Sequence, residues 1–458
     1  MESKLIKSLC IKRSVALVHL MKRTEYIRDI PHVPGSKVRL GGRISRVNDT
    51  KSVRFVWLRD ITGAVQLTVV KGKAAPELWK QVEELMPNYF VIVEGKVPED
   101  IKSASGVEVI PEMIEVVSKP QGLPPIDIEG VNPTGMDKRL DWRALDLRNP
   151  KQAAIFIVQS KLLEGMQRYL YSEKFMQTFT PSMMGVSSEG GSEVFSFSHF
   201  GKEAFLRQDP QLHRQLLMLA GFERIYEIGP SWRAELSNTP VHLTEHRTCA
   251  AELSFIEDER DIMKVEENLI ANAIKLVASE CRGELEIFDV ELKPPKVPFP
   301  VVEFPKIYDI LEELGFHPKR GEEDYSKQGE AALGEYMKEK HRSDFFFVNR
   351  FPYATKPFYV MRDDGDPTYA RSTDLMYKGL EMSSGGQREH RYEKIIAQAK
   401  NKGLDLKNLA WFTDFFKYGA PPHGGFSIGI ERLTARLLGI TNIREAALFP
   451  RAPDRLVP

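Results

Sequence analysis

Two patterns of apolar residues divide the chain into a strand-rich N-terminal part and a larger part with long helices. From residue 36 to about residue 119, short apolar runs end at Gly, Asp or Pro, which predicts strands. The runs are Val38–Leu40, Val53–Leu58, Ala64–Val70, Tyr89–Gly95 and Val107–Val117, with a helix predicted over Pro76–Leu85. Five strands with a helix between the third and the fourth suit a small Greek-key barrel of the oligonucleotide-binding (OB) kind, and a β-barrel adaptor fits the pattern as well.

In the larger part, apolar residues recur at helical spacing from Gln152 onward and again over about Arg260–Glu280. Strand-like segments lie between and after these helices. They are Ala204–Leu206, Arg224–Arg233, Cys249–Phe255, Phe345–Phe347, Phe358–Met361, Leu375–Met382 and Gly425–Ile428. Because the spacing is mostly not that of βαβ units, we predict an α+β domain built on an antiparallel sheet.

Prolines and glycines mark the domain boundaries. We divide the chain into an N-terminal extension (1–20), a barrel domain (21–119), a hinge (120–150) and a C-terminal domain (151–458). The extension carries Lys4, Lys7, Lys12 and Arg13 against a single acid. That composition is typical of a transit peptide, but also of an over-long reading frame whose true start is Met21. We predict a cytoplasmic protein, with a mitochondrial location as the alternative.

The composition excludes several classes of protein. Lys+Arg and Asp+Glu are both 64 of 458 residues, so the net charge of +0 argues against nucleic-acid binding by charge alone. Cys10, Cys249 and Cys281 are too far apart for a disulfide framework or a zinc site, which indicates a reducing compartment. No apolar run approaches the roughly 20 residues that cross a bilayer, so we expect no membrane partner.

The sequence contains no Gly-rich phosphate loop, dinucleotide fingerprint, Gly-x-Ser-x-Gly elbow or His-Glu-x-x-His motif, so any phosphate must be bound by side-chain cations. Arg233 ends a strand-like run and Glu235 is predicted on the same strand face, an arrangement that is more often a structural ion pair. Arg432 is predicted in the first turn of a helix, against the usual dipole preference. This position indicates an anionic ligand, with a packing corner as the alternative.

The acidic candidates are Asp374 and Glu381, with Ser384 close behind. Carboxylates near a hydroxyl suit Mg²⁺, although two such acids are usually just solvated. The glycine pair before Gln387 and Arg388 would let the backbone approach a ligand closely.

Five sequence blocks occur in a fixed order behind the predicted barrel: Phe205–Leu212, Trp232–Glu235, Ser384–Arg391, Pro421–Phe426 and Leu448–Arg451. Together they resemble class II aminoacyl-tRNA synthetases, and most of all the archaeal and eukaryotic type of aspartyl-tRNA synthetase. The resemblance covers about residues 21–458. The asparaginyl enzymes are similar too, but usually differ around Pro210–Gln215.

The resemblance implies ATP-dependent ligation of L-aspartate to tRNA through an aspartyl-adenylate, with Asp tRNA alone or both Asp and Asn tRNAs as acceptors. It makes the C-terminal domain the catalytic domain and the barrel the anticodon-binding domain. It also implies ATP and Mg²⁺ at the site and a homodimer that contains Pro181 in its interface. Two alternatives stay open: a paralogue that adenylates aspartate or a related acid for amide formation without tRNA, and a catalytically weakened tRNA-binding paralogue.

The resemblance assigns roles residue by residue. It implies that Arg233 grips the α-phosphate of ATP, that Arg432 holds the γ-phosphate, and that Glu235 completes the catalytic set. The wider ATP site would be Arg233, Glu235, His242, Leu243, Glu381, Gly429 and Arg432. The metal ligands would be Glu381, Ser384 and Asp374, and the amino-acid pocket Glu189, Gln211, Arg214, Ser384 and Arg388. Phe55 and Gln66 would read the central base of the anticodon.

Several positions near the substrate depart from the family's pattern. Family members carry lysine at the place of Arg214, serine at Asp209 and an acid at Ala250, and their loop usually has arginine at Val241. An arginine is larger and forked, so the pocket geometry must change. We therefore expect ATP handling to persist while amino-acid recognition is altered or weakened.

Overall fold

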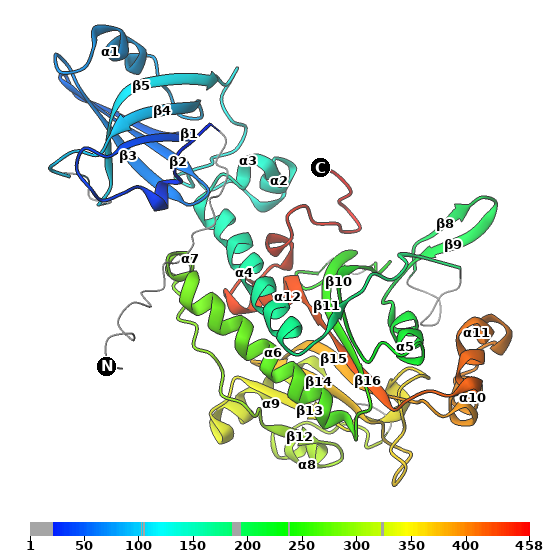
Figure 1. Ribbon diagram of the computed structural model, residues 1–458. Coiled ribbons are helices and arrows are strands. Elements are labelled where there is room, and N and C mark those ends of the chain that lie inside the picture. The colour runs from blue at the N-terminus through cyan, green and yellow to red at the C-terminus, as the bar shows by residue number, and fades with distance from the viewer. Residues whose placement is uncertain (1–21, 102, 104–105, 186–193, 237–238, 322–324) are drawn as a thin grey trace, which may run out of the picture. The chain divides into compact units, whose positions relative to one another are not determined.

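The computed structural model describes residues 22–101, 103, 106–185, 194–236, 239–321 and 325–458, so the N-terminal extension lies outside the described residues. The chain forms two compact units, Met1–Pro133 and Thr134–Pro458, and the division falls within residues 120–150 (Figure 1). No helix in the described ranges is long and apolar enough to cross a membrane.

The first unit contains the expected barrel. It closes in the strand order β1-β2-β3-β5-β4, and α1 lies between β3 and β4 in the chain. The elements are η1 (Ile27–Asp29), β1 (Lys37–Asp49), β2 (Val53–Asp60), β3 (Gly63–Val70), α1 (Pro76–Glu83), β4 (Phe90–Lys96) and β5 (Glu108–Ser118). Alternating residues such as Leu40, Val56, Leu67 and Val93 fill the interior, which leaves their strand neighbours on the outer surface.

The second unit is built on one large, mainly antiparallel sheet, as the α+β prediction requires. Its order is β12-β13-β14-β15-β16-β11-β10-β6. The strands are β6 (Met176–Gln177), β10 (Arg224–Trp232), β11 (Glu245–Ser254), β12 (Val301–Glu303), β13 (Phe345–Asn349), β14 (Ser372–Tyr377), β15 (Leu380–Arg388) and β16 (His423–Gly429).

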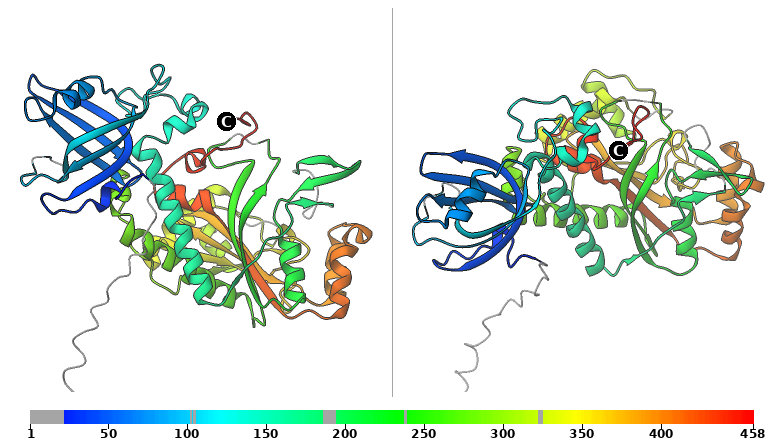
Figure 2. Two further views of the ribbon diagram at one scale, coloured as in Figure 1. Left: turned by 45° about the horizontal axis from the view of Figure 1, so that its top comes forward. Right: turned by 90° about the horizontal axis from the view of Figure 1, so that it is seen from above.

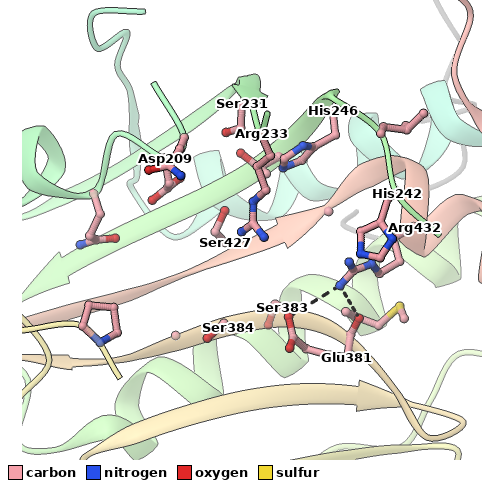
Figure 3. Close-up of a pocket in the computed structure, with 18 of the residues that line it drawn as sticks. Asp209, Ser231, Arg233, His242, His246, Glu381, Ser383, Ser384, Ser427 and Arg432 are labelled. Carbon is pink, nitrogen blue, oxygen red and sulfur yellow. Dashed lines mark hydrogen bonds and ion pairs between the residues drawn. The ribbon is translucent and has the colours of Figure 1, made fainter. Parts of the chain in front are cut away.

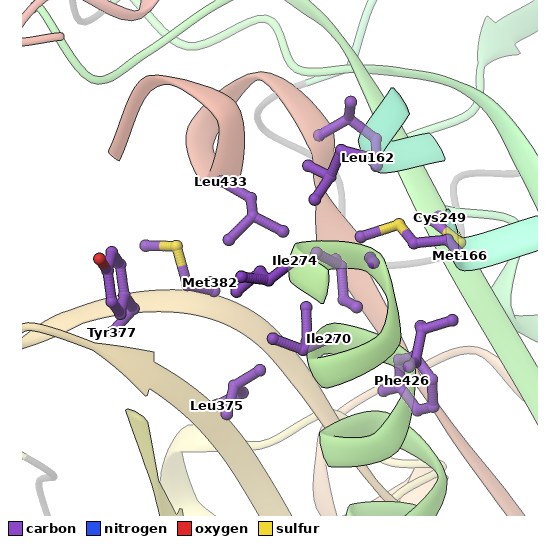
Figure 4. Packing of buried hydrophobic residues seen from close by; sticks show 14 of the residues in the cluster. Leu162, Met166, Cys249, Ile270, Ile274, Leu375, Tyr377, Met382, Phe426 and Leu433 are labelled. Carbon is purple, nitrogen blue, oxygen red and sulfur yellow. The ribbon is translucent and has the colours of Figure 1, made fainter. Parts of the chain in front are cut away.

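Two long helices cover one face of this sheet. They are α4 (Pro150–Ser172) and α6 (Glu259–Glu280), which pack against each other and, through α6, against β14, β15 and β16 (Figures 1 and 2). A β-carbon on Gly165 of α4 would lie only 2.7 Å from the Cα of Ala273 of α6, so this glycine permits the close contact of the two helices. Figure 4 shows the apolar core formed by α4, α6, α12 (Ile430–Leu437) and the sheet.

Side-chain alternation separates the two faces of the central strands. On β11, Cys249 and Ala251 point into the core, whereas His246 and Thr248 line a pocket on the opposite face. On β16, Phe426 and Ile428 are in the core and Ser427 lines the pocket. The period of two along each strand therefore places the polar residues of two neighbouring strands on one surface.

A three-stranded sheet and several shorter helices complete the unit. The small sheet has the order β7-β9-β8, and its hairpin projects from the unit in Figure 2. Its strands are β7 (Met183–Met184), β8 (Ser196–His199) and β9 (Lys202–Leu206). The remaining helices are α2 (Met136–Asp141), α3 (Arg143–Asp146), α5 (Gln211–Leu219), α7 (Arg282–Ile287), α8 (Lys306–Glu313), α9 (Lys327–His341), η2 (Tyr353–Thr355), α10 (Tyr392–Asn401), α11 (Leu406–Thr413), η3 (Asp414–Tyr418) and η4 (Ile443–Ala446).

Two of the predicted strands are wrong. Phe358–Met361 is buried but begins as a turn, in which the backbone N–H of Val360 donates to the Pro357 carbonyl (3.2 Å), and it pairs with β15 through a single bridge between Val360 and Arg388. The side-chain amide of Gln398 donates to the carbonyls of Phe358 (2.6 Å) and Val360 (3.0 Å). The segment Leu375–Met382 is a hairpin rather than one strand. Lys378 (φ 50°) and Gly379 (φ 69°) are both left-handed and turn the chain between β14 and β15.

Candidate active site

A pocket of about 320 Å³ lies on the face of the large sheet opposite α4 and α6. Its floor comes from β10, β11, β15 and β16, and its walls come from the segment before α5, the segment before β11 and the start of α12. Figure 3 shows polar side chains from these elements pointing into it. Ten residues predicted for the site line this pocket: Gln211, Arg233, Glu235, His242, Leu243, Glu381, Ser384, Arg388, Gly429 and Arg432.

Arg233 occupies one wall of the pocket with its guanidinium half-exposed. Arg233 and Glu235 follow the end of β10 at Trp232, so the expectation that both lie on one strand face is wrong. The chain leaves the sheet there, and Arg233 Nη1 lies 3.4 Å from Glu235 Oε1. The second oxygen of Glu235 lies 3.4 Å from His242 Nε2, so this carboxylate links an arginine to a histidine.

Arg432 lies in the first turn of α12, as predicted, and faces the pocket together with Glu381. Its Nη1 donates to the backbone carbonyl of Glu381 (3.1 Å) and lies 3.6 Å from the carboxylate of the same residue (Figure 3). Arg233, Glu381 and Arg432, which are far apart in the sequence, therefore meet around one cavity.

Acidic groups near Glu381 suit a divalent cation. Desolvation in the pocket and the neighbouring Asp374 carboxylate raise the pKa of Glu381, whereas Arg432 opposes the rise. Asp374 is the strand partner of Ser384 but does not line the pocket, and its carboxylate lies 3.4 Å from Lys356 Nζ. Within the part of the chain that is described, no three His, Cys, Asp or Glu side chains come close enough to hold a metal by themselves. A cation that shares its coordination with substrate phosphates fits this set.

His246 lies between the cationic groups of the pocket. Burial, reinforced by Arg233 and Arg432, lowers its pKa to about 4. The imidazole is therefore neutral near pH 7 and offers one hydrogen-bond donor and one acceptor rather than a third positive charge.

At the other end of the pocket, buried side chains form a closed network. Arg388 Nε donates to Glu252 Oε1 (3.1 Å), and Arg388 Nη2 donates to Gln211 Oε1 (3.0 Å). Gln211 Nε2 donates in turn to Glu252 Oε2 (3.1 Å). Arg214 also donates to Gln211 Oε1 (2.9 Å) but is buried behind the pocket wall and is not among the lining residues. Glu189, the remaining predicted pocket residue, lies outside the described residues.

Several lining residues were not predicted, namely Ser231, Thr248, Lys356, Tyr359 and Ser383. Ser231 and Thr248 lie on the pocket-facing side of β10 and β11, two strands on which no site residue was predicted. Lys356 and Tyr359 belong to the irregular segment that follows η2, for which sequence periodicity gives no signal.

Phe55 and Gln66 lie on the outer face of the barrel. Phe55 is the strand partner of Thr68, and Gln66 is the partner of Trp57, so these side chains share one surface. The Phe55 and Trp57 rings are 6.4 Å apart, and Gln66 Nε2 donates to Thr68 Oγ1 (3.0 Å). An aromatic pair beside a fixed amide can stack on and hydrogen-bond an unpaired base.

The sequence models of two known protein families match the chain, one in each unit. The model described as tRNA synthetases class II (D, K and N) matches residues 135–453. The chain belongs to this family of synthetases. A second model, described as an OB-fold nucleic acid binding domain, matches residues 38–117 of the same synthetase.

Curated relatives and solved structures cover nearly the whole synthetase. An aspartate–tRNA(Asp) ligase of Pyrococcus furiosus is 42% identical over 96% of this chain and 100% of its own length. An aspartate–tRNA(Asp/Asn) ligase of Methanopyrus kandleri is also 42% identical over the same shares. Among solved structures, asparaginyl-tRNA synthetase of Pyrococcus horikoshii complexed with asparaginyl-adenylate is similar with a TM-score of 0.87 and 33% identity, over 96% of this chain and 100% of that chain.

Proposed function

We propose that this synthetase ligates L-aspartate to tRNA at the expense of ATP, through an aspartyl-adenylate. The convergence of Arg233, Arg432 and Glu381 in one pocket carries the proposal for ATP. Relatives named as aspartate–tRNA ligases, 42% identical along 96% of the chain, support aspartate and tRNA as the other substrates.

The adenylation reaction depends on cationic groups in the site rather than on a nucleophilic side chain of the protein. The aspartate α-carboxylate attacks the α-phosphorus of ATP and pyrophosphate leaves, so two anions must be brought together in line. Arg233 binds the α-phosphate and stabilises the charge that develops there. Arg432, at the start of α12, binds the γ-phosphate, and His246 stays neutral near the two arginines.

We assign Glu381 and Ser384 as the residues that hold Mg²⁺, with Asp374 adding negative charge from behind Lys356. A cation there would offset the repulsion between the Glu381 and Asp374 carboxylates, which adds to desolvation in raising the pKa of Glu381. Mg²⁺ neutralises phosphate charge in such a site.

The barrel determines which tRNA is charged. Phe55 stacks on the central anticodon base and Gln66 hydrogen-bonds it, which the shared outer surface of β2 and β3 permits. Relatives carry either Asp or Asp/Asn in their names, and we propose both tRNAs as acceptors here. An anticodon module is of no use to an enzyme that forms a free amide, which weighs against the paralogue without tRNA. The intact arginine pair weighs against a catalytically weakened tRNA-binding paralogue.

A homodimer is the assembly we propose. β6 is the edge strand of the large sheet, and the side chains around it are apolar and exposed: Tyr171, Met176, Phe179 and Met183, with Phe179 79% exposed. An apolar edge of this kind suits pairing with a second copy near Pro181. Cys249 is a free, buried thiol, in keeping with a cytoplasmic location.

Aminoacylation with labelled aspartate tests the function directly. Separate Asp and Asn tRNA transcripts should both be charged, and ribonuclease should abolish the product. Failure of aspartate to reach either transcript while another amino acid does would contradict the proposal. Product that resists ribonuclease would favour the amide-forming alternative.

A further inference from the structure

The amino-acid end of the pocket contains an acid and an arginine that bind each other. Asp209 lies just before α5 and lines the pocket, with its side chain 21% exposed. Arg214 lies one turn into α5 and is only 1% exposed. The carboxylate of Asp209 therefore faces the cavity, whereas the guanidinium of Arg214 lies behind it.

The bonds of Arg214 are directed to the protein. Its Nη1 donates to Asp209 Oδ1 (3.3 Å), and its Nη2 donates to Asp209 Oδ2 and to Gln211 Oε1 (2.9 Å). This is a two-pronged arginine–carboxylate pair, which fixes both the position and the orientation of the acid. Arg214 does not line the pocket, and its Nε is buried without a hydrogen-bond partner among the described residues.

Arg214 is surrounded by acidic residues, and the family's further acid is replaced here by Ala250. Ala250 lies on the pocket-facing side of β11, opposite Glu227 of β10 and two residues before Glu252 on the same face. Arg214 is attracted by Asp209, Glu252 and Glu227, so its guanidinium lies over this acidic part of the sheet.

The part of the pocket wall that is left for a ligand here carries hydrogen-bond acceptors. Arg214 neutralises the inner side of Asp209, and the outer side opens into the pocket. Ser231 Oγ also lines this pocket, is buried, and bonds to no other group among the residues that the structure describes. Figure 3 shows Ser231 and Asp209 on the same side of the cavity, close to Arg233, where an α-carboxylate would bind. A carboxylate and a hydroxyl at this point suit a cationic hydrogen-bond donor.

We propose that Asp209 receives the α-ammonium group of the amino-acid substrate, and that Arg214 is a positioning residue that does not touch the substrate. The side-chain carboxylate of aspartate is then left to Arg388, whose Nη1 bonds to no described residue. The inference rests on the proposed function for the identity of the amino acid, but its geometry concerns the ammonium group of any amino acid.

A comparison of L-aspartate with succinate tests this proposal, because succinate keeps both carboxylates and lacks the ammonium group. The KM of aspartate is measured by ATP–pyrophosphate exchange, and the inhibition constant of succinate is measured against aspartate. Asp209→Asn should raise the KM of aspartate about tenfold to hundredfold, the effect of one hydrogen bond between charged groups, and leave succinate binding equal or tighter. Arg214→Met should act in the same way, and Arg214→Lys, which keeps the charge, should lie between it and the wild type.

Arg388→Met is the matched control, since it should weaken aspartate and succinate alike. An unchanged KM for ATP shows that each variant is folded. If the Arg214 variants weaken succinate as much as aspartate, Arg214 binds a substrate carboxylate and the proposal is wrong. If the wild type exchanges with a different amino acid and not with aspartate, the proposed function fails. The same comparison with that amino acid and its desamino analogue then still decides the role of Asp209.

Discussion

Gly425 on β16 is the position where a single methyl group should damage amino-acid binding most. A β-carbon there would lie 2.1 Å from the carbonyl oxygen of Ala251 and 2.2 Å from Glu252 Oε2. The Gly425 carbonyl also accepts from Arg388 Nη2 (3.0 Å). Gly425→Ala therefore pushes Glu252 away from Arg388, with which it forms a buried ion pair at 3.1 Å.

The cost follows from the burial of this pair. Glu252 is 0% and Arg388 5% exposed, and breaking a buried pair typically costs about 3–5 kcal/mol. Because the substitution displaces Glu252 rather than removing it, we expect a loss near the lower end, about 3 kcal/mol. The free energy of unfolding is measured by urea denaturation, and the KM of aspartate by ATP–pyrophosphate exchange. The KM should rise, because Arg388 loses the group that orients it.

Gly283→Ala in α7 is the matched control, since its β-carbon would have no neighbour within 4 Å. It should leave the KM of aspartate unchanged and stabilise the protein slightly, by about 0.5–1 kcal/mol. The reasoning is refuted if Gly425→Ala matches Gly283→Ala in both stability and KM.

Three further predictions concern other parts of the molecule. Burial lowers the pKa of His423 to about 4, against about 6.5 when it is unfolded. As the pH falls from 6.5 to 4, the unfolded chain takes up a proton at this residue and the folded chain does not, so the free energy of unfolding decreases by about 3 kcal/mol. Urea denaturation at successive pH values should show a smaller decrease for His423→Asn. Phe55→Ala should raise the KM of tRNA about 5- to 100-fold without changing pyrophosphate exchange; Met113→Ala, exposed on β5, should change neither. Gly165→Val should destabilise the catalytic unit by about 2 kcal/mol or more, because its β-carbon would meet Ala273 of α6 at 2.7 Å, and unchanged urea denaturation would disprove the tight α4–α6 contact.

Much of the fold follows from local patterns in the sequence. The five barrel strands alternate inward apolar with outward polar residues, so each was predicted within a few residues apart from β1, which is longer than its apolar run. The two long helices were predicted because their apolar faces recur over many turns. The cap that fixes where α6 begins was not predicted: Asp258 accepts from the backbone N–H of Arg260.

The errors arose where tertiary contacts replace the local rule. Phe358–Met361 is apolar enough for a strand, but it begins as a turn that closes on Pro357, and a distant side chain, Gln398, bonds to the carbonyls of Phe358 and Val360. The turn between β14 and β15 uses Lys378 and Gly379, which lack the Asn-Gly signature of such turns.

At the candidate site, too, the sequence predicted part of the arrangement and tertiary contacts determine the rest. Resemblance identified ten of the residues that line the pocket, but not that Arg214 lies behind its wall. That placement depends on the hydrogen bonds of Arg214 to Asp209 and Gln211 and on its burial, which arise only in the folded chain.

The central claim is that two arginines and one glutamate act on a single molecule of ATP. Aspartate-dependent ATP–pyrophosphate exchange tests it most directly, with Arg233→Met, Arg432→Met and Glu381→Gln beside Arg260→Met, whose side chain is 68% exposed on α6. We predict that each pocket variant loses about 10²- to 10³-fold in exchange rate while Arg260→Met keeps the wild-type rate. Pocket variants that exchange as fast as Arg260→Met would contradict the account.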